Sequence, residues 1–318
     1  MYQSLSISGL ITLDLHALNN EGAEGNTMMT RMVETVDQAG NKHTVNAISG
    51  DMFKHIIVEH LLDEAKAAAL PLCSGCASFN ANRICADTSF MNTPGWDKET
   101  PESVILKGVL EKCVIDDCAG ILITGKIGKE RSIARKSCVE VGWIVGRPSK
   151  TVTDAYFHAK YVPEGRGSGS GQGENLGQNI FHRPASSGQY AIVIGLDFYK
   201  VSRNDITLEH DIQEQERRKR MAALIRSVLK AIVKPTGAHR NTQSPHVVDF
   251  TGVIATSSSS LPAPTVSALN EAYTSEIKRI AAALNGLSTK TSSIATQEFN
   301  SLAQFAEQMA EIERTAAA

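Results

Sequence analysis

Residues 5–26 read LSISGLITLDLHALNNEGAEGN, and the rest of the chain is organised around this stretch. Its apolar residues, beginning with Leu5 and Ile7, alternate with smaller or polar ones, which predicts a half-buried strand. The turn that follows, Leu18–Asn26, holds three asparagines and two glycines, so its backbone N–H groups and amides can wrap a phosphate or a nucleotide edge. Two acidic residues in this turn argue against a simple anion cradle, and an ordinary polar strand exit is the alternative.

The composition is that of a globular protein with a sizeable core. Of 318 residues, 42% are apolar and 21% are charged, and the 32 Lys and Arg against 34 Asp and Glu give a net charge of -2. Any basic site must therefore be local. No apolar run is long enough for a membrane span, and the N-terminus lacks a secretory signal pattern. We therefore expect a cytoplasmic protein with no membrane partner.

An amphipathic helix is predicted from Met52 to Ala69, because apolar residues there recur at i, i+3 and i+4. Ser49 or Asp51 can cap its N-terminus. Lys54 and His55 lie in the first turn, where the helix dipole favours a bound anion. The alternative is that Lys54 is only solvated.

Two hairpins are predicted to leave the main sheet. Thr30–Val36 and Lys42–Ala47 flank a turn and form the first. Tyr156–Val162 and Gln178–Arg183 form the second, which is long and has a Gly/Ser-rich tip over Glu164–Glu174. Side chains on this second hairpin that are suited to stacking on bases are Phe157, Phe181, His182 and Arg183.

Residues 71–103 have little periodicity and predict a long insertion. Val104–Leu110 predicts a strand or a short helix, and Cys113–Ile123 predicts a buried strand interrupted by a polar bend. A dense basic stretch follows, which fits a solvated face as well as an RNA contact. Its residues are Lys126, Lys129, Arg131, Arg135 and Lys136.

The second half of the chain alternates strands and helices. Strands are expected over Ser137–Val145, Thr151–Tyr161, Gln189–Phe198 and Val247–Ala255, and helices over Leu208–Ile232, Val266–Asn285 and Thr296–Arg314. Between them lies a small loop, Gly237–Asn241, with one cation. Reduced to its core, the order is strand, helix, strand, strand, strand, helix, strand, with large insertions. This order is compatible with a β-α-β-β-α-β arrangement, and we therefore predict an α+β, ferredoxin-like antiparallel sheet.

Several stretches together resemble one known family, the backbone subunit of type I CRISPR surveillance complexes (Cascade), also named the Cas-seven or DevR autoregulator family. These stretches occur in the family's order and span about residues 5–255. They are LDLHALNNEGAEGN (Leu13–Asn26), ISGDMFKH (Ile48–His55), CVIDDCAGIL (Cys113–Leu122), QYAIVIGLDFYKVSRND (Gln189–Asp205) and GAHRNTQSP (Gly237–Pro245).

The resemblance implies a modified RNA-recognition-motif palm over residues 1–255, followed by a linker and C-terminal helices over 256–318. It implies a finger insertion at 18–48, an insertion at 70–112 and a thumb hairpin at 156–188. It also implies that copies polymerise along the guide RNA, which pairs with a target DNA strand, beside other Cascade subunits. Implied RNA contacts, besides those on the thumb, are Asn19, Asn20, Gly22, Lys54, His55, His239 and Arg240.

No enzymatic activity is expected. A related branch of the family, in type III complexes, cuts RNA with an aspartate in the loop after the first strand, where this chain has Glu21 and Glu24 and no Asp. Adjacent Asp116 and Asp117 would face opposite sides of a strand. A stand-alone transcriptional regulator is the alternative function, but there is no helix-turn-helix pair and no positive net charge.

All six cysteines lie between residues 73 and 138. Cys73-x-x-Cys76 is a zinc half-site, and Cys113, Cys118, Cys85 or His60 can complete it. The predicted ligand set is Cys73, Cys76, Cys113 and Cys118. Free thiols in a packed insertion are the alternative, and no other cofactor is expected.

Overall fold

The structure is a computed structural model that describes residues 2–97, 99–124, 127, 132–160, 179–236, 241–287 and 293–318. The strands in this part of the chain are β1 (Ser4–His16), β2 (Asn20–Glu24), β3 (Thr27–Thr30), β4 (Met32–Val36), β5 (Lys42–Ile48), β6 (Ile121–Ile123), β7 (Ile133–Arg135), β8 (Val139–Val141), β9 (Ile144–Lys160), β10 (Asn179–Leu196), β11 (His246–Ser257) and β12 (Ile294–Phe299). The main helices are α1 (Gly50–Ala67), α4 (Glu102–Lys112), α5 (Val114–Ala119), α6 (Glu214–Val233), α7 (Tyr273–Gly286) and α8 (Leu302–Ala317).

The central sheet has the predicted ferredoxin-like topology. The core elements follow one another as β1-α1-β9-β10-α6-β11, and the strand order is β11-β1-β10-β9 with every neighbouring pair antiparallel. The β4–β5 hairpin forms as predicted, but it does not leave the sheet: the end of β5 pairs with β9, so the hairpin continues the strand order beyond β9. At the other edge β12 extends the sheet beyond β11. The predicted α+β fold class is therefore confirmed.

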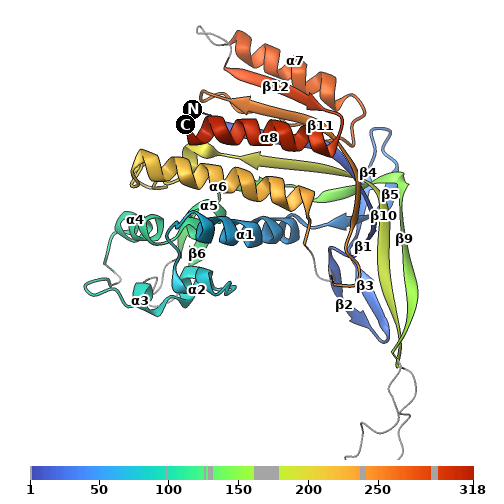
Figure 1. Cartoon of the computed structure of the whole chain (residues 1–318), viewed down its shortest axis with the longest axis horizontal. Helices are drawn as coiled ribbons and strands as arrows, with labels where there is room; N and C mark the ends of the chain where they lie inside the picture. The colour runs from blue at the N-terminus through green and yellow to red at the C-terminus, as the bar shows by residue number, and fades with distance from the viewer. Residues whose placement is uncertain are drawn as a thin grey trace, which may run out of the picture.

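The two faces of the sheet are covered unequally (Figure 1). Alternate β1 residues, such as Leu5 and Ile7, belong to the main buried core, which also contains Ile57 of α1 and Leu224 of α6. α8 packs beside α6 and over β11. On the other face a smaller cluster joins Val253 of β11 to residues of α7. This layering follows from the period-2 alternation of apolar side chains along the strands.

The start of α1 agrees with its predicted cap, because the Met52 N–H donates to the Ser49 hydroxyl over 3.2 Å. The helix begins at Gly50 and ends at Ala67, two residues before the predicted limits. By contrast, α6 begins six residues later than predicted. The Asn204 amide donates to the Ser103 carbonyl and to Asp211, and its Oδ1 accepts from the Ile206 N–H, which fixes the stretch before α6 as a turn.

The second hairpin is a direct extension of two core strands. β9 and β10 pair without interruption of either strand from the sheet out to Lys160 and Asn179, and they project from the body as one arm (Figure 1). The Gly/Ser-rich tip, 164–174, lies outside the described residues.

The 70–112 insertion consists of short helices. They are α2 (Ser74–Ala77), η1 (Arg83–Ala86), α3 (Thr88–Met91) and then α4, which contains the residues expected as a strand or short helix. Cys113–Ile123 was predicted as a bent strand, and this is wrong. Residues 114–119 form helix α5, which ends at Gly120 with a φ of 73°, and only Ile121–Ile123 are a strand. Tertiary partners of its two aspartates override the β propensity of Val114 and Ile115.

The C-terminal region also differs from the prediction. Thr296–Arg314 was expected as one helix, but its first part belongs to β12, and α8 begins only after the Ser301 cap. The reason is packing, since Phe299 on β12 and Phe305 on α8 both contact Phe250 of β11. A strand as well as helices therefore extends the core. None of the described helices combines the length and the apolar composition needed to cross a bilayer.

Close approach of β11 to β1 requires a glycine at position 252. A Cβ there would lie 2.3 Å from the Ser8 carbonyl oxygen and 2.8 Å from the Phe299 ring. Because that carbonyl belongs to a central strand, we expect Gly252→Ala to lower the free energy of unfolding by about 1–3 kcal/mol. Urea denaturation measures this. Gly195→Ala on β10, where nothing lies within 4 Å, is the matched control, and equal midpoints for both variants would contradict the packing argument.

Candidate nucleic-acid interface

The turn after β1 is a short hairpin, β2–β3, which is tied to the start of α1. The Ser49 N–H donates to Asn19 Oδ1 over 2.8 Å, and the Arg31 N–H donates to the Asn19 carbonyl over 3.1 Å. Asn19 is only 8% exposed. Its side-chain oxygen therefore positions the hairpin against the α1 cap, and an RNA contact by Asn19 stays a prediction.

The next residues of the hairpin differ from one another in exposure. Both side-chain polar atoms of Asn20 are buried, and neither has a hydrogen-bond partner among the described residues. Gly22 is exposed, with a φ of 101° that favours glycine, and nothing lies within 4 Å of a Cβ built there. Glu21 pairs with Arg31, which also lies 5.4 Å from the centre of the Trp143 ring. One of the two acids that argued against an anion cradle, Glu21, thus has a cationic partner within the protein.

The hairpin meets the arm at its base. The His182 N–H of β10 donates to the Asn26 carbonyl over 2.8 Å, and His182 pairs with Thr27 of β3. A cavity of about 310 Å³ lies at this junction, lined by Ala23, Gly25, Asn26, Met28, Phe181, His182 and Arg183. We call this set the arm junction. Three of the predicted arm residues, Phe181, His182 and Arg183, therefore line this cavity, whereas the predicted loop contacts Asn19, Asn20 and Gly22 do not.

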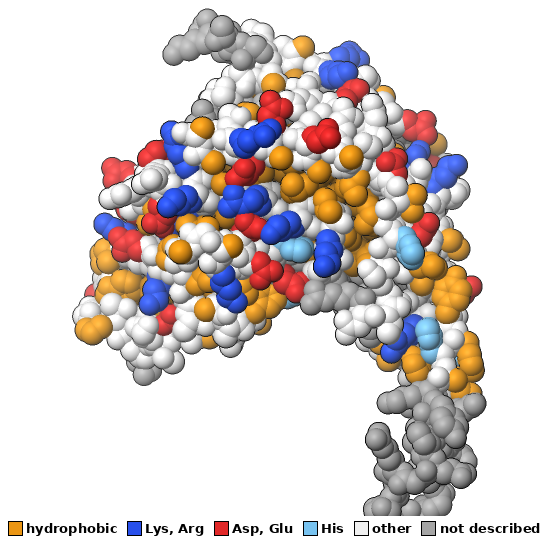
Figure 2. Space-filling view, in the orientation of Figure 1, with side chains coloured by type: hydrophobic (Ala, Val, Ile, Leu, Met, Phe, Trp, Pro, Cys, Tyr) orange, Lys and Arg blue, Asp and Glu red, His pale blue; other side chains and the backbone are white. Residues whose placement is uncertain are grey.

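Aromatic and cationic side chains are stacked along the arm. His158 and Phe181 stack with 5.5 Å between ring centres, and the Arg183 guanidinium lies 4.8 Å from the Phe181 ring. Phe157 contacts His182 and is 61% exposed. Figure 2 shows hydrophobic, His and Lys or Arg side chains together on this arm. Such surfaces offer ring faces and positive charge to unpaired bases.

The late loop also reaches the base of the arm. Arg183 donates to the Thr242 hydroxyl over 3.2 Å, and the Gln243 amide donates to the Pro184 carbonyl over 3.1 Å. His239 and Arg240, the predicted contacts of this loop, lie outside the described residues. The described end of the loop is therefore held beside the arm junction.

Lys54 and His55 line a second cavity, of about 660 Å³. Its walls include Phe79 and Arg83, which the 70–112 insertion supplies, and the His55 and Phe79 ring centres are 5.1 Å apart. Burial, reinforced by the charge of Arg83, lowers the pKa of Lys54. Sequence reasoning missed Phe79 and Arg83, because only folding of the insertion brings them to α1.

A sequence model described as "CRISPR-associated negative auto-regulator DevR/Csa2" matches residues 7–278. The chain belongs to this DevR/Csa2 family. No curated protein matches it.

Solved structures similar to this DevR/Csa2 chain include two titled "CRISPR RNA-guided surveillance complex", the second of them in a pre-nicking state. Both are 12% identical with a TM-score of 0.49, and they align over 98% and 97% of this chain and 99% of their own. The Csc2 protein of Thermofilum pendens is 13% identical over 87% of this chain and 74% of its own, with a TM-score of 0.38.

Several arginines of the DevR/Csa2 chain are used inside the protein. Asp117, fully buried, accepts hydrogen bonds from Arg135 over 2.7 Å and from Arg220 over 2.8 Å, and the Ser202 hydroxyl donates to it over 3.1 Å. Arg217 is buried as well and donates to the Phe198 carbonyl. The run of four cations at 217–220 is therefore half internal. Figure 2 shows Lys and Arg interleaved with Asp and Glu over the helical face.

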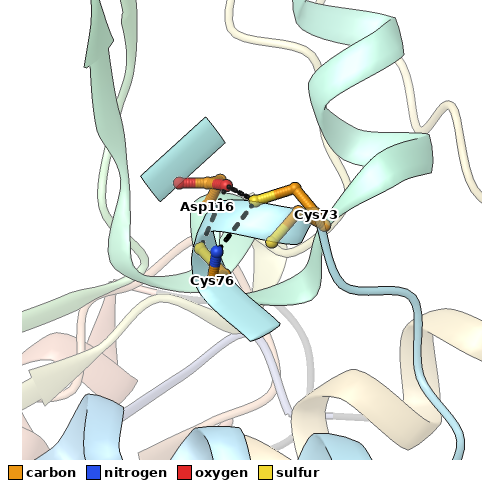
Figure 3. A group of neighbouring side chains, drawn as sticks. Cys73, Cys76 and Asp116 are labelled. Atoms are coloured by element: carbon orange, nitrogen blue, oxygen red, sulfur yellow. Dashed lines mark hydrogen bonds between the residues drawn. The ribbon is translucent and has the colours of Figure 1, made fainter. Parts of the chain in front are cut away.

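A second polar cluster lies at the base of the 70–112 insertion. The thiols of Cys73 and Cys76 each lie 3.4 Å from Asp116 Oδ2, and Figure 3 shows the three side chains pointing toward one another. Cys113 belongs to the same buried group. Burial raises the pKa of Asp116 to about 8.

The predicted fourth ligand, Cys118, is not in this group, and Asp116 takes its place. Position 118 is five residues beyond Cys113, so in a helix it is rotated by roughly 140°, whereas position 116 returns to nearly the same side. Two other candidates also lie elsewhere. Cys85 points to the Leu122 carbonyl and His60 to the Lys234 carbonyl.

Substitution of Arg220 tests whether this buried arginine stabilises the core and is not a surface cation. Arg220→Met removes a partner of the buried Asp117 carboxylate, and we expect a loss of about 3–5 kcal/mol in the free energy of unfolding. Lys219→Met, on an exposed position of the same helix, is the control and should change stability little. Chemical denaturation of both variants measures the difference. A comparable loss in the two would refute the internal role of Arg220.

Proposed function

We propose that the chain is a non-catalytic guide-RNA-binding subunit whose copies polymerise as the backbone of a type I CRISPR surveillance complex. Its main support is the arm junction, where the first loop, the arm and the late loop bring an open glycine backbone, stacked aromatic rings and a cation together. Membership of the DevR/Csa2 family is the second support. Guide RNA is the expected partner, and target DNA is bound through the guide.

The groups at the proposed interface suit RNA of any sequence. Backbone N–H groups at Gly22 and single cations such as Lys54 and Arg183 recognise phosphate, and the rings of Phe157 and Phe181 stack on any base. A subunit that must accept every spacer needs this kind of contact. Base pairing by the guide then supplies target specificity.

Polymerisation is supported by the arm. It extends beyond the body of the protein and carries exposed apolar side chains, among them Tyr156 (48% exposed), Phe157 and Ile180 (40% exposed). Exposed apolar groups that are contiguous along a projecting hairpin are typical of interaction surfaces. Other copies of the chain and other Cascade subunits are the partners we infer.

The acidic and histidine candidates for catalysis, Asp117, Glu21 and His16, are paired or buried, which disfavours a catalytic role. Asp117 is neutralised by two arginines, and Glu21 pairs with Arg31. Burial lowers the pKa of His16 to about 4, and its ring packs edge-on against Tyr190. These residues therefore offer neither a pair of free carboxylates for a metal nor an accessible base.

A stand-alone regulator of transcription is the second candidate, because the matching family model is described as an auto-regulator. It would require preferential binding to one duplex DNA sequence. Gel-shift competition between duplex DNA and single-stranded RNA separates the two. The proposed function requires that unrelated RNA sequences compete equally and better than duplex DNA.

Lys54 is expected to contact one RNA phosphate. Lys54→Met should weaken binding equally for unrelated RNA sequences and reduce the slope of log K against log salt by about 0.7. Fluorescence anisotropy at several salt concentrations measures both. Lys66→Met, an exposed cation in the last turn of the same helix, is the matched control. An unchanged slope for Lys54→Met would remove this residue from the interface.

Assembly is tested by co-expression with a guide RNA followed by ribonuclease digestion. We expect protection of the spacer in regular increments and a particle of high mass in size-exclusion chromatography. The double change Phe181→Ala, Arg183→Ala should shorten the protected RNA, since it removes the stacked pair. Leu287→Ala, an exposed apolar residue at the end of α7, is the control. A wild-type monomer without RNA would exclude the backbone role.

A further inference from the structure

Four side chains at the base of the 70–112 insertion form a buried site of metal-binding type. One ligand atom from each of Cys73, Cys76, Cys113 and Asp116 lies within 4.8 Å of all the others. In a tetrahedral zinc site, with bonds of about 2.3 Å to sulfur and about 2.0 Å to oxygen, sulfur and oxygen lie about 3.5 Å apart. The observed separation of 3.4 Å between each of two thiols and Asp116 Oδ2 agrees with this (Figure 3).

The spacing of these residues also fits a zinc site. They come in two pairs, Cys73-x-x-Cys76 and Cys113-x-x-Asp116, one at each end of the insertion. Pairs of ligands separated by two intervening residues are the usual arrangement in structural zinc sites. The second pair was hidden in the sequence because its last member is an aspartate.

Hydrogen bonding by thiols alone does not satisfy Asp116. Its side chain is fully buried, and Oδ1 has no partner among the described residues. The two thiols that face Oδ2 are weak donors. A carboxylate removed from water in this way is strongly unfavourable unless a cation or good donors compensate it.

The surroundings of the cluster support a structural site. The Cys76 N–H points to Cys73 Sγ over 3.2 Å, so the backbone already orients that sulfur. The Val114 N–H donates to the Pro71 carbonyl over 2.9 Å, and this holds the two ends of the insertion together beside the cluster. Four protein ligands leave no open position for substrate.

We propose that Cys73, Cys76, Cys113 and Asp116 bind one Zn²⁺ ion, which closes the base of the 70–112 insertion. Binding releases to solvent the protons that the thiols and Asp116 carry in the metal-free site, and the ion links two chain segments about 40 residues apart. The site does not depend on the proposed RNA function. It does have a consequence for it, because Cys76, Phe79 and Arg83 line the same cavity as Lys54.

The test begins with the metal content of the purified full-length protein. We expect about one zinc per chain by mass spectrometry, and X-ray absorption with three sulfur ligands and one oxygen ligand. Cys76→Ser and Asp116→Asn should lose the ion, whereas Cys118→Ser should keep it. Cys85→Ser is the matched control, since Cys85 belongs to the same insertion and is not in the cluster.

Two results would overturn the proposal. The first is wild-type protein that holds no zinc after purification from zinc-supplemented cells and shows no sulfur-to-metal absorption band with Co²⁺. The second is absorption data with four sulfur ligands together with loss of zinc in Cys118→Ser, which would restore the ligand set expected from sequence. If Cys76→Ser or Asp116→Asn fails to fold, the wild-type spectra still decide.

Discussion

The arrangement of the helices and strands in this protein depends on the hydrogen bonds and ion pairs of one buried carboxylate, that of Asp117. It joins α5 to Arg135 of β7, to Arg220 of α6 and to Ser202 in the turn after η2 (Phe198–Lys200). Each of these elements comes from a different part of the chain. Removing one partner would leave an unpaired charge in the core, so the elements are constrained to fold together. The same constraint withdraws two arginines from the surface.

Helix α5 connects this ion network to the cysteine cluster. Consecutive residues in a helix are rotated by about 100°, so Asp116 and Asp117 point to different neighbours. Asp117 points to the arginines, and Asp116 points to Cys73 and Cys76. In this way the short helix α5 connects the ion network of Asp117 in the core to the cysteine cluster at the base of the insertion. The insertion in turn supplies Phe79 and Arg83 to the cavity at Lys54.

Sequence patterns correctly predicted the elements that are determined by residues close together in the sequence. The strand β1, the helix α1 with its Ser49 cap and the β4–β5 hairpin all follow from periodicity and turn chemistry, and so does the β-α-β-β-α-β order. The failures share another cause. α5 is a helix because Asp116 and Asp117 have partners far away in the sequence, those of Asp117 including Ser202 and Arg220, and β12 is a strand because Phe299 packs on Phe250. Asp116 as a fourth ligand could not be seen while Cys113–Ile123 was expected to be a strand.

With a net charge of -2, the RNA binding proposed above would depend on individually placed cations, and Lys54 shows the surroundings of one such candidate. Its ammonium is partly removed from water and faces the like charge of Arg83 across the same cavity, and both effects lower its pKa. Each effect makes the empty site unfavourable for a charged lysine. A phosphate placed between Lys54 and Arg83 relieves both, because it neutralises the repulsion and replaces the lost water with strong acceptors. Under the proposed function, this cavity would select for negative charge and not for any base, as a sequence-independent RNA coat requires.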